Sequence, residues 1–231
     1  DLSIFLFGTS EKKIINLKHL FKSDAKLTII DIGANVGSIS LPLAKIFNES
    51  KIFSIEPTNY AFKKLTKNLN LNKDLKKNIF LNQLFLSKIK KPKAVWSSWN
   101  FDNNKNKHKQ HLGTLYSIKK KSYISLTSFI NLKKIKKVDF IKLDVDGHEL
   151  DVLKSGEKFF IKNKPIIFIE IAPYLYPEFG YKCEELITYI KKLKYSFYSE
   201  DLKKISNIDN YIEKITYGGS KNFYLMKNYK T

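Results

Sequence analysis

Short apolar runs alternate with amphipathic stretches along this chain. Five runs have the length and composition of buried strands, at 27–32, 51–55, 79–84, 138–143 and 166–171. Apolar positions at helical spacing separate or follow them, at 38–47, 62–69, 147–155 and 183–193. This alternation predicts an α/β fold with a mostly parallel sheet and helices on both of its faces.

Both ends of the chain, and one internal stretch, depart from this pattern. Apolar positions from Ile14 to Phe21 predict a helical lead-in within residues 1–26. The segments 195–199 and 222–227 alternate like strands, so we expect seven strands with an antiparallel C-terminal edge. The stretch 97–112 is long and polar, which predicts an inserted loop or lid. We expect one domain over 1–231, because a chain of this length is too short for two ordinary ones.

The most informative turn follows the first predicted strand. Gly33, Asn35 and Gly37 punctuate it, and glycines let the backbone turn sharply and a ligand lie against it. A carboxylate, Asp31, stands two residues before the first glycine, where it suits a cationic amino acid better than a pyrophosphate. Glu56 ends the second strand, where an acid can accept from both hydroxyls of a ribose. Loop and acid together favour S-adenosylmethionine over NAD as cofactor.

Polar residues end all five predicted core strands. Such residues share the sheet edge where open α/β sheets bind ligands, and here they are Asp31, Glu56, Asn82 or Gln83, Asp144 and Glu170. Asp144 is a candidate to orient or deprotonate a hydroxyl of the acceptor, the substrate that would receive the cofactor's methyl group. Glu170 is a candidate to line the pocket of that acceptor. His148 is the natural general base, because an imidazole ordinarily titrates near neutral pH. Asp146 and Glu149 have the spacing of a helix capping box. Clustered carboxylates suit Mg²⁺ or Ca²⁺, but no spacing requires an ion, so we predict no metal.

Three motifs in order make the chain resemble a known family. They are Asp-Ile-Gly-Ala-Asn-Val-Gly at 31–37, Ser-Ile-Glu-Pro at 54–57, and the stretch 138–156 that contains Lys-Leu-Asp-Val-Asp-Gly-His-Glu. From about Leu27 to Ile171 the chain resembles the FkbM family of S-adenosylmethionine-dependent methyltransferases. The resemblance implies a Rossmann-like class I methyltransferase fold and, most often, O-methylation of hydroxyls on sugars or natural products. The family usually has Glu where this chain has Asp146.

In this fold the cofactor would lie along the strand ends. We expect Asp31 and the loop residues Gly33, Ala34, Asn35 and Gly37 to hold the methionine part, and Glu56 the ribose. Asn82 or Gln83 would reach the adenine amino group. Asp144 would lie where the methyl group is transferred.

The composition of the chain indicates which classes of binding partner suit it. The net charge of +20 comes with 42 basic residues that are all lysine, which resembles the codon choice of an AT-rich genome. Arginine is the residue that reads guanine and clamps phosphate bidentately, so its absence argues against a dedicated nucleic-acid enzyme. Peripheral contact with an anionic membrane remains physically open to so many lysines. One cysteine, Cys183, excludes a disulfide framework and suits a reducing compartment such as the cytoplasm.

No apolar run is long enough to span a bilayer. The chain begins at Asp1 without a methionine, which leaves an upstream segment open, and the sequence carries no signal of oligomeric state.

We therefore predict O-methylation of a hydroxyl on a small molecule or glycan, with two alternatives. An RNA methyltransferase would use the lysine surface and Trp96, Trp99 and Phe101 for stacking. A degenerate domain would bind the cofactor without turnover. Amine methylation at adenine is disfavoured because the chain has no adjacent pair of prolines, and pyrimidine C5 methylation because Cys183 lies outside any motif.

Overall fold

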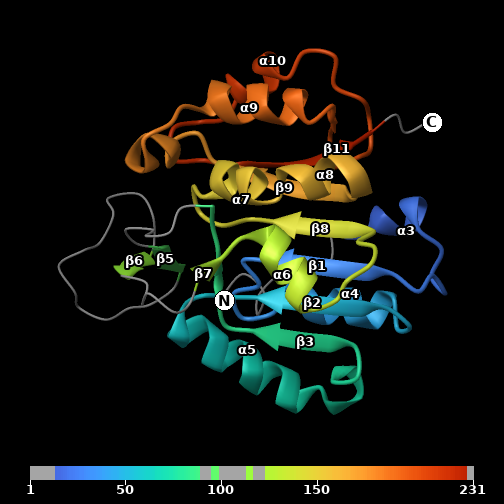
Figure 1. The fold of residues 1–231 in the computed structure, drawn as a ribbon. Helices are drawn as coiled ribbons and strands as arrows, with labels where there is room; N and C mark the ends of the chain where they lie inside the picture. The colour runs from blue at the N-terminus through green and yellow to red at the C-terminus, as the bar shows by residue number, and fades with distance from the viewer. Residues whose placement is uncertain (1–13, 89–94, 99–112, 117–122, 228–231) are drawn as a thin grey trace. The chain divides into compact units, whose positions relative to one another are not determined.

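The computed structural model describes residues 14–88, 95–98, 113–116 and 123–227, with 95–98 and 113–116 described as backbone. The chain divides into two compact units, Asp1–Phe85 with Lys91–Tyr123, and Leu86–Lys90 with Ile124–Thr231. The boundaries between the units fall within two short strands, β4 (Phe85–Leu86) and β7 (Tyr123–Ile124, labelled in Figure 1), and between residues 90 and 91. The prediction of one domain over the whole chain stays a prediction.

The first unit contains three parallel strands, β1 (Thr28–Ile32), β2 (Lys51–Ile55) and β3 (Ile79–Asn82). Thr28 pairs with Lys51 across β1 and β2, and Ile52 pairs with Ile79 across β2 and β3. After its first residue, β1 is buried throughout, as is β2, which is the pattern of parallel strands covered on both faces. The predicted strands are confirmed, although β3 ends two residues earlier than expected.

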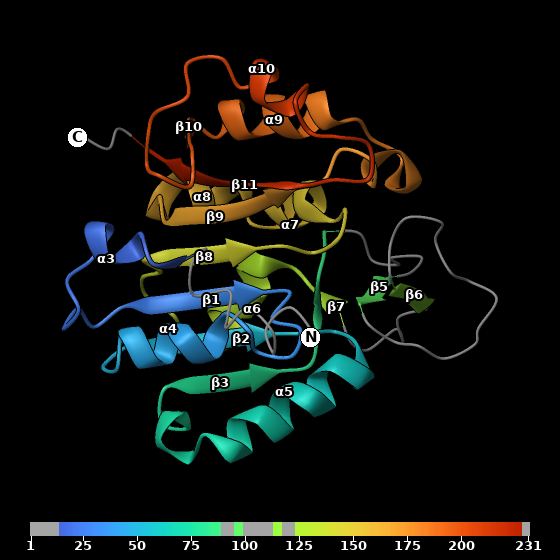
Figure 2. The same ribbon diagram turned by 180° about the vertical axis from the view of Figure 1, so that it is seen from behind.

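Helices α4 (Ser40–Ile46) and α5 (Asn59–Leu71) also belong to the first unit, and a 3₁₀ turn, η1 (Lys73–Leu75), follows α5 (Figure 2). Helix α4 packs against β2 and β3. The buried residues of α5, Ala61, Leu65 and Leu69, recur every four positions along one face. Within the predicted lead-in, α3 covers only Leu17–Leu20, and residues 1–13 lie outside the described part.

The second unit contains β8 (Phe140–Leu143), β9 (Ile166–Ile171), β10 (Ser196–Tyr198) and β11 (Lys221–Met226). Strand β8 runs parallel to β9, β11 runs antiparallel to β9, and β10 runs antiparallel to β11. The predicted antiparallel C-terminal edge is therefore confirmed. All four residues of β8 are buried.

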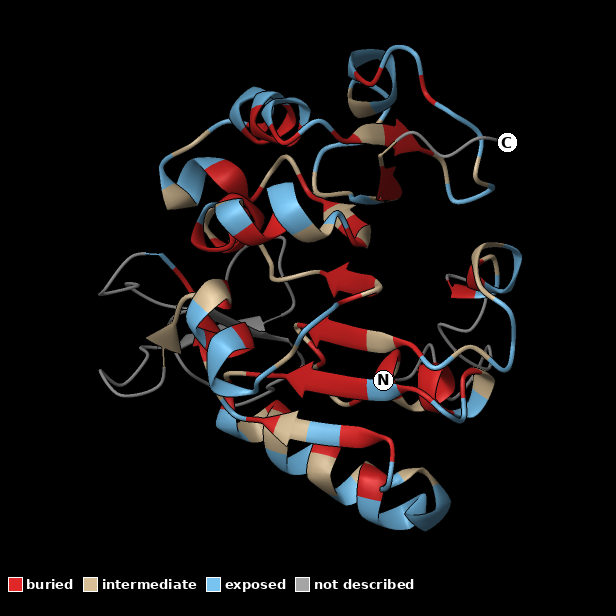
Figure 3. Ribbon diagram, turned by 45° about the vertical axis from the view of Figure 1, so that its right-hand side comes forward, coloured by how far each residue is buried: buried red, intermediate tan, exposed pale blue. Residues whose placement is uncertain are grey.

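Helix α7 (Glu149–Ser155) packs against three other helices of this unit, α6 (Leu126–Leu132), α8 (Glu157–Asn163) and α9 (Cys183–Lys192). Two shorter elements complete the unit, η2 (Tyr176–Phe179) and α10 (Asp209–Ile212). Figure 3 shows helices that are buried on one side and exposed on the other, as amphipathic helices over a sheet should be.

Part of the predicted 97–112 insertion is strand. Ser97 and Ser98 end β5 (Val95–Ser98), which pairs antiparallel with β6 (Gly113–Tyr116). Residues 99–112 lie outside the described part. Across both units, the described core strands are the five parallel and two antiparallel strands expected for the α/β class.

Candidate functional site

The glycine loop after β1 closes over the end of β2. The N–H groups of Gly33 and Ala34 both donate to the carbonyl of Ile55, at 3.0 and 2.9 Å. Gly33, Asn35 and Gly37 adopt left-handed conformations with φ of 81°, 49° and 93°, which glycine tolerates best and asparagine better than most residues. The loop is thus a tight turn whose position follows from the pairing of β1 with β2.

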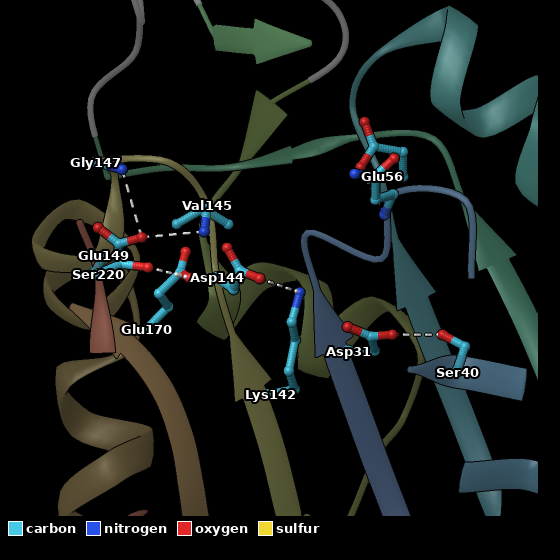
Figure 4. Close-up of polar contacts among 11 residues, drawn as sticks. Asp31, Ser40, Glu56, Lys142, Asp144, Val145, Gly147, Glu149, Glu170 and Ser220 are labelled. Atoms are coloured by element: carbon cyan, nitrogen blue, oxygen red, sulfur yellow. Dashed lines mark hydrogen bonds and ion pairs between the residues drawn. The ribbon is translucent and has the colours of Figure 1, made fainter. Parts of the chain in front are cut away.

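Glu56 fixes this loop from the end of β2. Its Oε2 accepts from the Asn35 N–H at 3.0 Å, and its Oε1 accepts from the Thr58 N–H at 2.9 Å and from Thr58 Oγ1 at 2.5 Å. The side chain is only 6% exposed. Glu56, the residue predicted to bind the ribose, therefore holds its carboxylate directly beside the glycine loop (Figure 4).

Acceptor groups in this loop fit the donors of S-adenosylmethionine. Asn35 Oδ1 is buried and has no hydrogen-bond partner within the described residues. A buried acceptor of this kind requires a donor to offset its desolvation, and the cofactor carries an ammonium and ribose hydroxyls. Asn35 and Glu56 together present the oxygen atoms that such donors need.

Asp31 lies inside β1 rather than at its end. Ser40 Oγ donates to Asp31 Oδ2 at 2.6 Å and lies 2.7 Å from Ser54 Oγ, and all three side chains are fully buried. This contact ties the first residue of α4 to β1 and β2, so Asp31 positions the helix that follows the loop.

The two adenine candidates differ in burial. Asn82 is the last residue of β3 and 5% exposed, and its Nδ2 donates to the carbonyl of Phe80 at 2.7 Å. The backbone carbonyl of Asn82 accepts from the Glu56 N–H at 3.1 Å. Gln83, in contrast, is exposed.

In the second unit, strand register brings two predicted carboxylates together. Lys142 pairs with Phe168 and Leu143 with Ile169, so the next residues, Asp144 and Glu170, lie side by side where β8 ends. Carboxylate oxygens of Asp144, Asp146 and Glu170 all lie within 4.8 Å of one another. Three carboxylates at this spacing could also accept a divalent ion, but an acidic cluster alone does not identify a metal site, and we assign none.

Each of the paired carboxylates has a polar neighbour (Figure 4). Ser220 Oγ donates to Glu170 Oε1 at 2.7 Å, and Lys142 Nζ lies 3.2 Å from Asp144 Oδ2. The charge of Asp144, followed by burial and a hydrogen bond with Asp144, raises the pKa of Glu170 well above its usual value. Ionising two adjacent carboxylates is unfavourable because the two negative charges repel each other, so this pair holds a proton more tightly than an isolated acid.

His148, the predicted general base, is packed rather than open. It is 8% exposed, and its ring centroid lies 4.2 Å from that of Phe179. The structure thus brings Asp144 and Glu170 together and buries His148 against an aromatic ring.

The capping-box interpretation of Asp146 and Glu149 is wrong in position. The N-cap of α7 is His148, and Asp146 adopts a left-handed conformation with φ of 48°. Glu149 instead turns back into the preceding loop, where its Oε1 accepts from the N–H groups of Val145 at 3.0 Å and Gly147 at 3.4 Å. Burial raises the pKa of Glu149 to about 8.

A model of the methyltransferase FkbM domain matches residues 31–197, which is more than half of the chain. The chain belongs to the FkbM methyltransferase family. The matched range begins at Asp31 and includes the glycine loop, Glu56, Asp144 and Glu170. S-adenosylmethionine is the cofactor of this FkbM methyltransferase.

Solved structures show the same fold at low identity. A methyltransferase FkbM from Methylobacillus flagellatus KT has a TM-score of 0.53 and 16% identity over 87% of this chain and 43% of that one, so our chain spans under half of that relative's length. An S-adenosylmethionine-dependent methyltransferase from Aquifex aeolicus has a TM-score of 0.51 and 15% identity over 98% and 93%. The N-terminal domain of human METTL16 has a TM-score of 0.51 and 12% identity over 94% and 67%. These likenesses confirm the Rossmann-like class I methyltransferase fold. No protein of curated function matches the sequence.

The sequence interpretation missed several polar residues that support the site of this FkbM methyltransferase. Four of them are small hydroxyl residues with no distinctive spacing, so only their contacts reveal them. They are Ser40, Ser54, Thr58 and Ser220. Lys142 carried a usable signal, because a lysine inside an otherwise apolar strand must be paired.

Proposed function

We propose that this FkbM methyltransferase methylates a hydroxyl oxygen of a sugar, a glycan or another small acceptor. The observation that carries the proposal is the pair of carboxylates, Asp144 and Glu170, where β8 and β9 bring them together. An alcohol is a weak nucleophile that must lose its proton during attack, so its methylation benefits from a positioned base.

S-adenosylmethionine, when bound, would supply the methyl group on a sulfonium, whose sulfur leaves readily as a neutral thioether. The protein's own task is then to align the acceptor and to receive its proton. Asp144 accepts a hydrogen bond from the hydroxyl and orients it. The proton passes to the Asp144–Glu170 pair through the carboxylate of Asp144, because Glu170, whose pKa the charge of Asp144 raises, already holds a proton.

The first unit is assigned to the cofactor. Asn35 and the backbone of 33–37 would bind the methionine part, and Glu56 the ribose, because these are the groups with acceptors facing the loop. Asp31 would act through Ser40 by holding α4 in place. Asn82 or Gln83 would contact the adenine amino group.

We favour a small acceptor over nucleic acid because all 42 basic residues are lysine, and the chain has no arginine to clamp phosphate bidentately. No helix among the described residues is long and apolar enough to cross a membrane. Separately, we propose a cytoplasmic location, because a chain with one cysteine, Cys183, suits a reducing compartment. RNA methylation and cofactor binding without turnover are the outcomes that would replace our proposal.

The Asp144→Asn variant tests this assignment. We expect turnover to fall by about 100-fold or more, the contribution of a positioned base, while S-adenosylmethionine affinity stays close to wild type. The melting temperature should fall, because the buried Lys142 loses its charged partner, so turnover is measured at a temperature where the variant is folded. Asp139→Asn is the matched control, because Asp139 precedes the same strand but pairs with the exposed Lys137. His148→Ala separates the two candidate bases, since it should cost stability through lost packing on Phe179 and leave the pH dependence of turnover unchanged. An active Asp144→Asn enzyme would contradict the proposal.

A further inference from the structure

Lys142 lies where a lysine without a compensating charge would be energetically unfavourable. It stands in the middle of β8, between the fully buried Ile141 and Leu143, and its side chain is only 7% exposed. A buried ammonium is costly unless an opposite charge compensates it. The chain has many lysines whose charge solvent can screen, so the burial of this one needs a reason.

The partner of Lys142 is one of the proposed catalytic groups. Its Nζ lies 3.2 Å from Asp144 Oδ2, and the two side chains come from alternate residues, so they leave the same face of the strand (Figure 4). The same spacing occurs at Lys137 and Asp139, at 2.6 Å, but there the lysine side chain is 77% exposed. Asp139 is 12% exposed, but solvent screens the charge of the exposed Lys137, so this pair contributes little to stability. In the Lys142–Asp144 pair the ammonium is buried while the Asp144 side chain is 36% exposed, so the lysine charge acts in a lower effective dielectric than that of an exposed lysine.

Several negative groups surround Asp144 in the described part of the second unit. Asp146 and Glu170 lie within 4.8 Å through their carboxylate oxygens, and Glu149 of α7 is close enough to feel the charges of Asp144 and Asp146. Tyr174 feels the charges of Asp146 and Glu170. Ser220 of the segment before β11 contributes a neutral donor to Glu170. Lys142 supplies a positive charge from within the sheet.

We propose that Lys142 is a positioning residue that keeps Asp144 ionised and aligned, so that the proton of the acceptor hydroxyl has the Asp144–Glu170 pair as its destination. The inference rests on the proposed function and assigns a role beyond it. In the balanced step, the O–H bond of the acceptor breaks and the oxygen keeps the electron pair for its new bond to the methyl carbon. The bond between the methyl carbon and the sulfur of bound S-adenosylmethionine would break at the same time, and its electron pair would stay on sulfur in the departing neutral thioether, S-adenosylhomocysteine. The proton is taken up by the carboxylate pair, and no oxidant or reductant is required.

The charge of Lys142 has a measurable consequence. A neighbouring cation favours the ionised form of a carboxylate, so its removal must raise the pH at which the pair gives up its shared proton. An opposite charge within about 4–6 Å changes an acid's pKa by about one to three units, and this sets the size of the expected shift.

The experiment follows the titration of Glu170 in the whole chain by carbon NMR of ¹³C-carboxyl-labelled Asp and Glu, with no cofactor or acceptor added. Glu170→Gln assigns the signal. In Lys142→Met the midpoint should move to higher pH by about one to three units. Lys142→Arg, which keeps the charge, should titrate near wild type, and Lys137→Met, which removes an exposed lysine in the same kind of pair, should leave the midpoint unchanged.

An unchanged midpoint in Lys142→Met would overturn the proposal, and so would an equal shift in Lys137→Met. If Lys142→Met does not fold, Lys142→Gln is measured with the same expectation. The readout needs no turnover. A shift without methyl transfer would therefore support the role of Lys142 and count against the function, whereas methyl transfer without a shift would do the reverse.

Discussion

Replacing Glu149 by Gln should change how the stability of this protein depends on pH. The carboxyl of Glu149 is 2% exposed, its Oε2 has no hydrogen-bond partner among the described residues, and burial raises its pKa from 4.5 to about 8. The folded chain therefore keeps a proton that the unfolded chain releases above about pH 4.5. Between these values the unfolded state binds fewer protons, so the free energy of unfolding falls as pH rises.

The magnitude follows from the two pKa values. At about 1.4 kcal/mol per pKa unit, the change from 4.5 to about 8 corresponds to about 5 kcal/mol. About 3 kcal/mol of this loss falls between about pH 5 and about pH 8. The amide of the Glu149→Gln variant cannot titrate, but it keeps an oxygen that can accept from the N–H groups of Val145 and Gly147. The variant should therefore lack this part of the pH-dependent decline.

Urea unfolding at a series of pH values measures the effect as the difference between wild type and Glu149→Gln. The comparison uses the change of that difference with pH, because the variant also carries a constant cost for its buried amide. Glu184→Gln is the control, since Glu184 is exposed in the first turn of α9. Parallel stability curves for wild type and Glu149→Gln would refute the reasoning.

Two further variants test other parts of the structure. Glu56→Ala should weaken S-adenosylmethionine binding by about 1.5–3 kcal/mol in calorimetry, the scale of hydrogen bonds to a charged group, and unchanged affinity would remove Glu56 from the cofactor site. Gly147→Ala should destabilise the fold by about 1–3 kcal/mol more than Gly180→Ala. Both glycines have positive φ, but a Cβ at Gly147 would overlap the Phe179 ring while one at Gly180 meets nothing within 4 Å. Equal melting temperatures would show that Phe179 moves aside freely.

The strands were predictable because burial on both faces leaves a continuous apolar run. Lys51–Ile55 and Ile166–Ile171 have the predicted bounds for this reason. Helix α8 (Glu157–Asn163) was not predicted, because only Gly156 separates it from α7 and its buried residues, Phe159 and Phe160, are too few to show a period. Helix starts were less predictable than strands, since Asp146 has the chemistry of an N-cap but adopts a left-handed conformation.

The residues proposed to bind the cofactor were easier to predict from the sequence than the residues proposed to contact the acceptor. The loop from Gly33 to Gly37 needs glycine for conformational reasons, and that need is visible in the sequence. The proximity of Asp144 and Glu170 depends on the register of two strands that are distant in the chain, which spacing does not encode. Lys142 could have been singled out as the lysine inside an apolar strand, but its partner, Asp144, becomes evident only from the structure.

Methyl transfer from labelled S-adenosylmethionine tests the central claim most directly. Purified protein is incubated with the labelled cofactor and, separately, with a mixed pool of sugars and glycans and with total RNA. We predict label on a hydroxyl of the small acceptors, in an alkali-stable methyl ether, and loss of that product in the Asp144→Asn variant. Label in RNA, or no transfer to any hydroxyl by protein that binds the cofactor, would contradict the account.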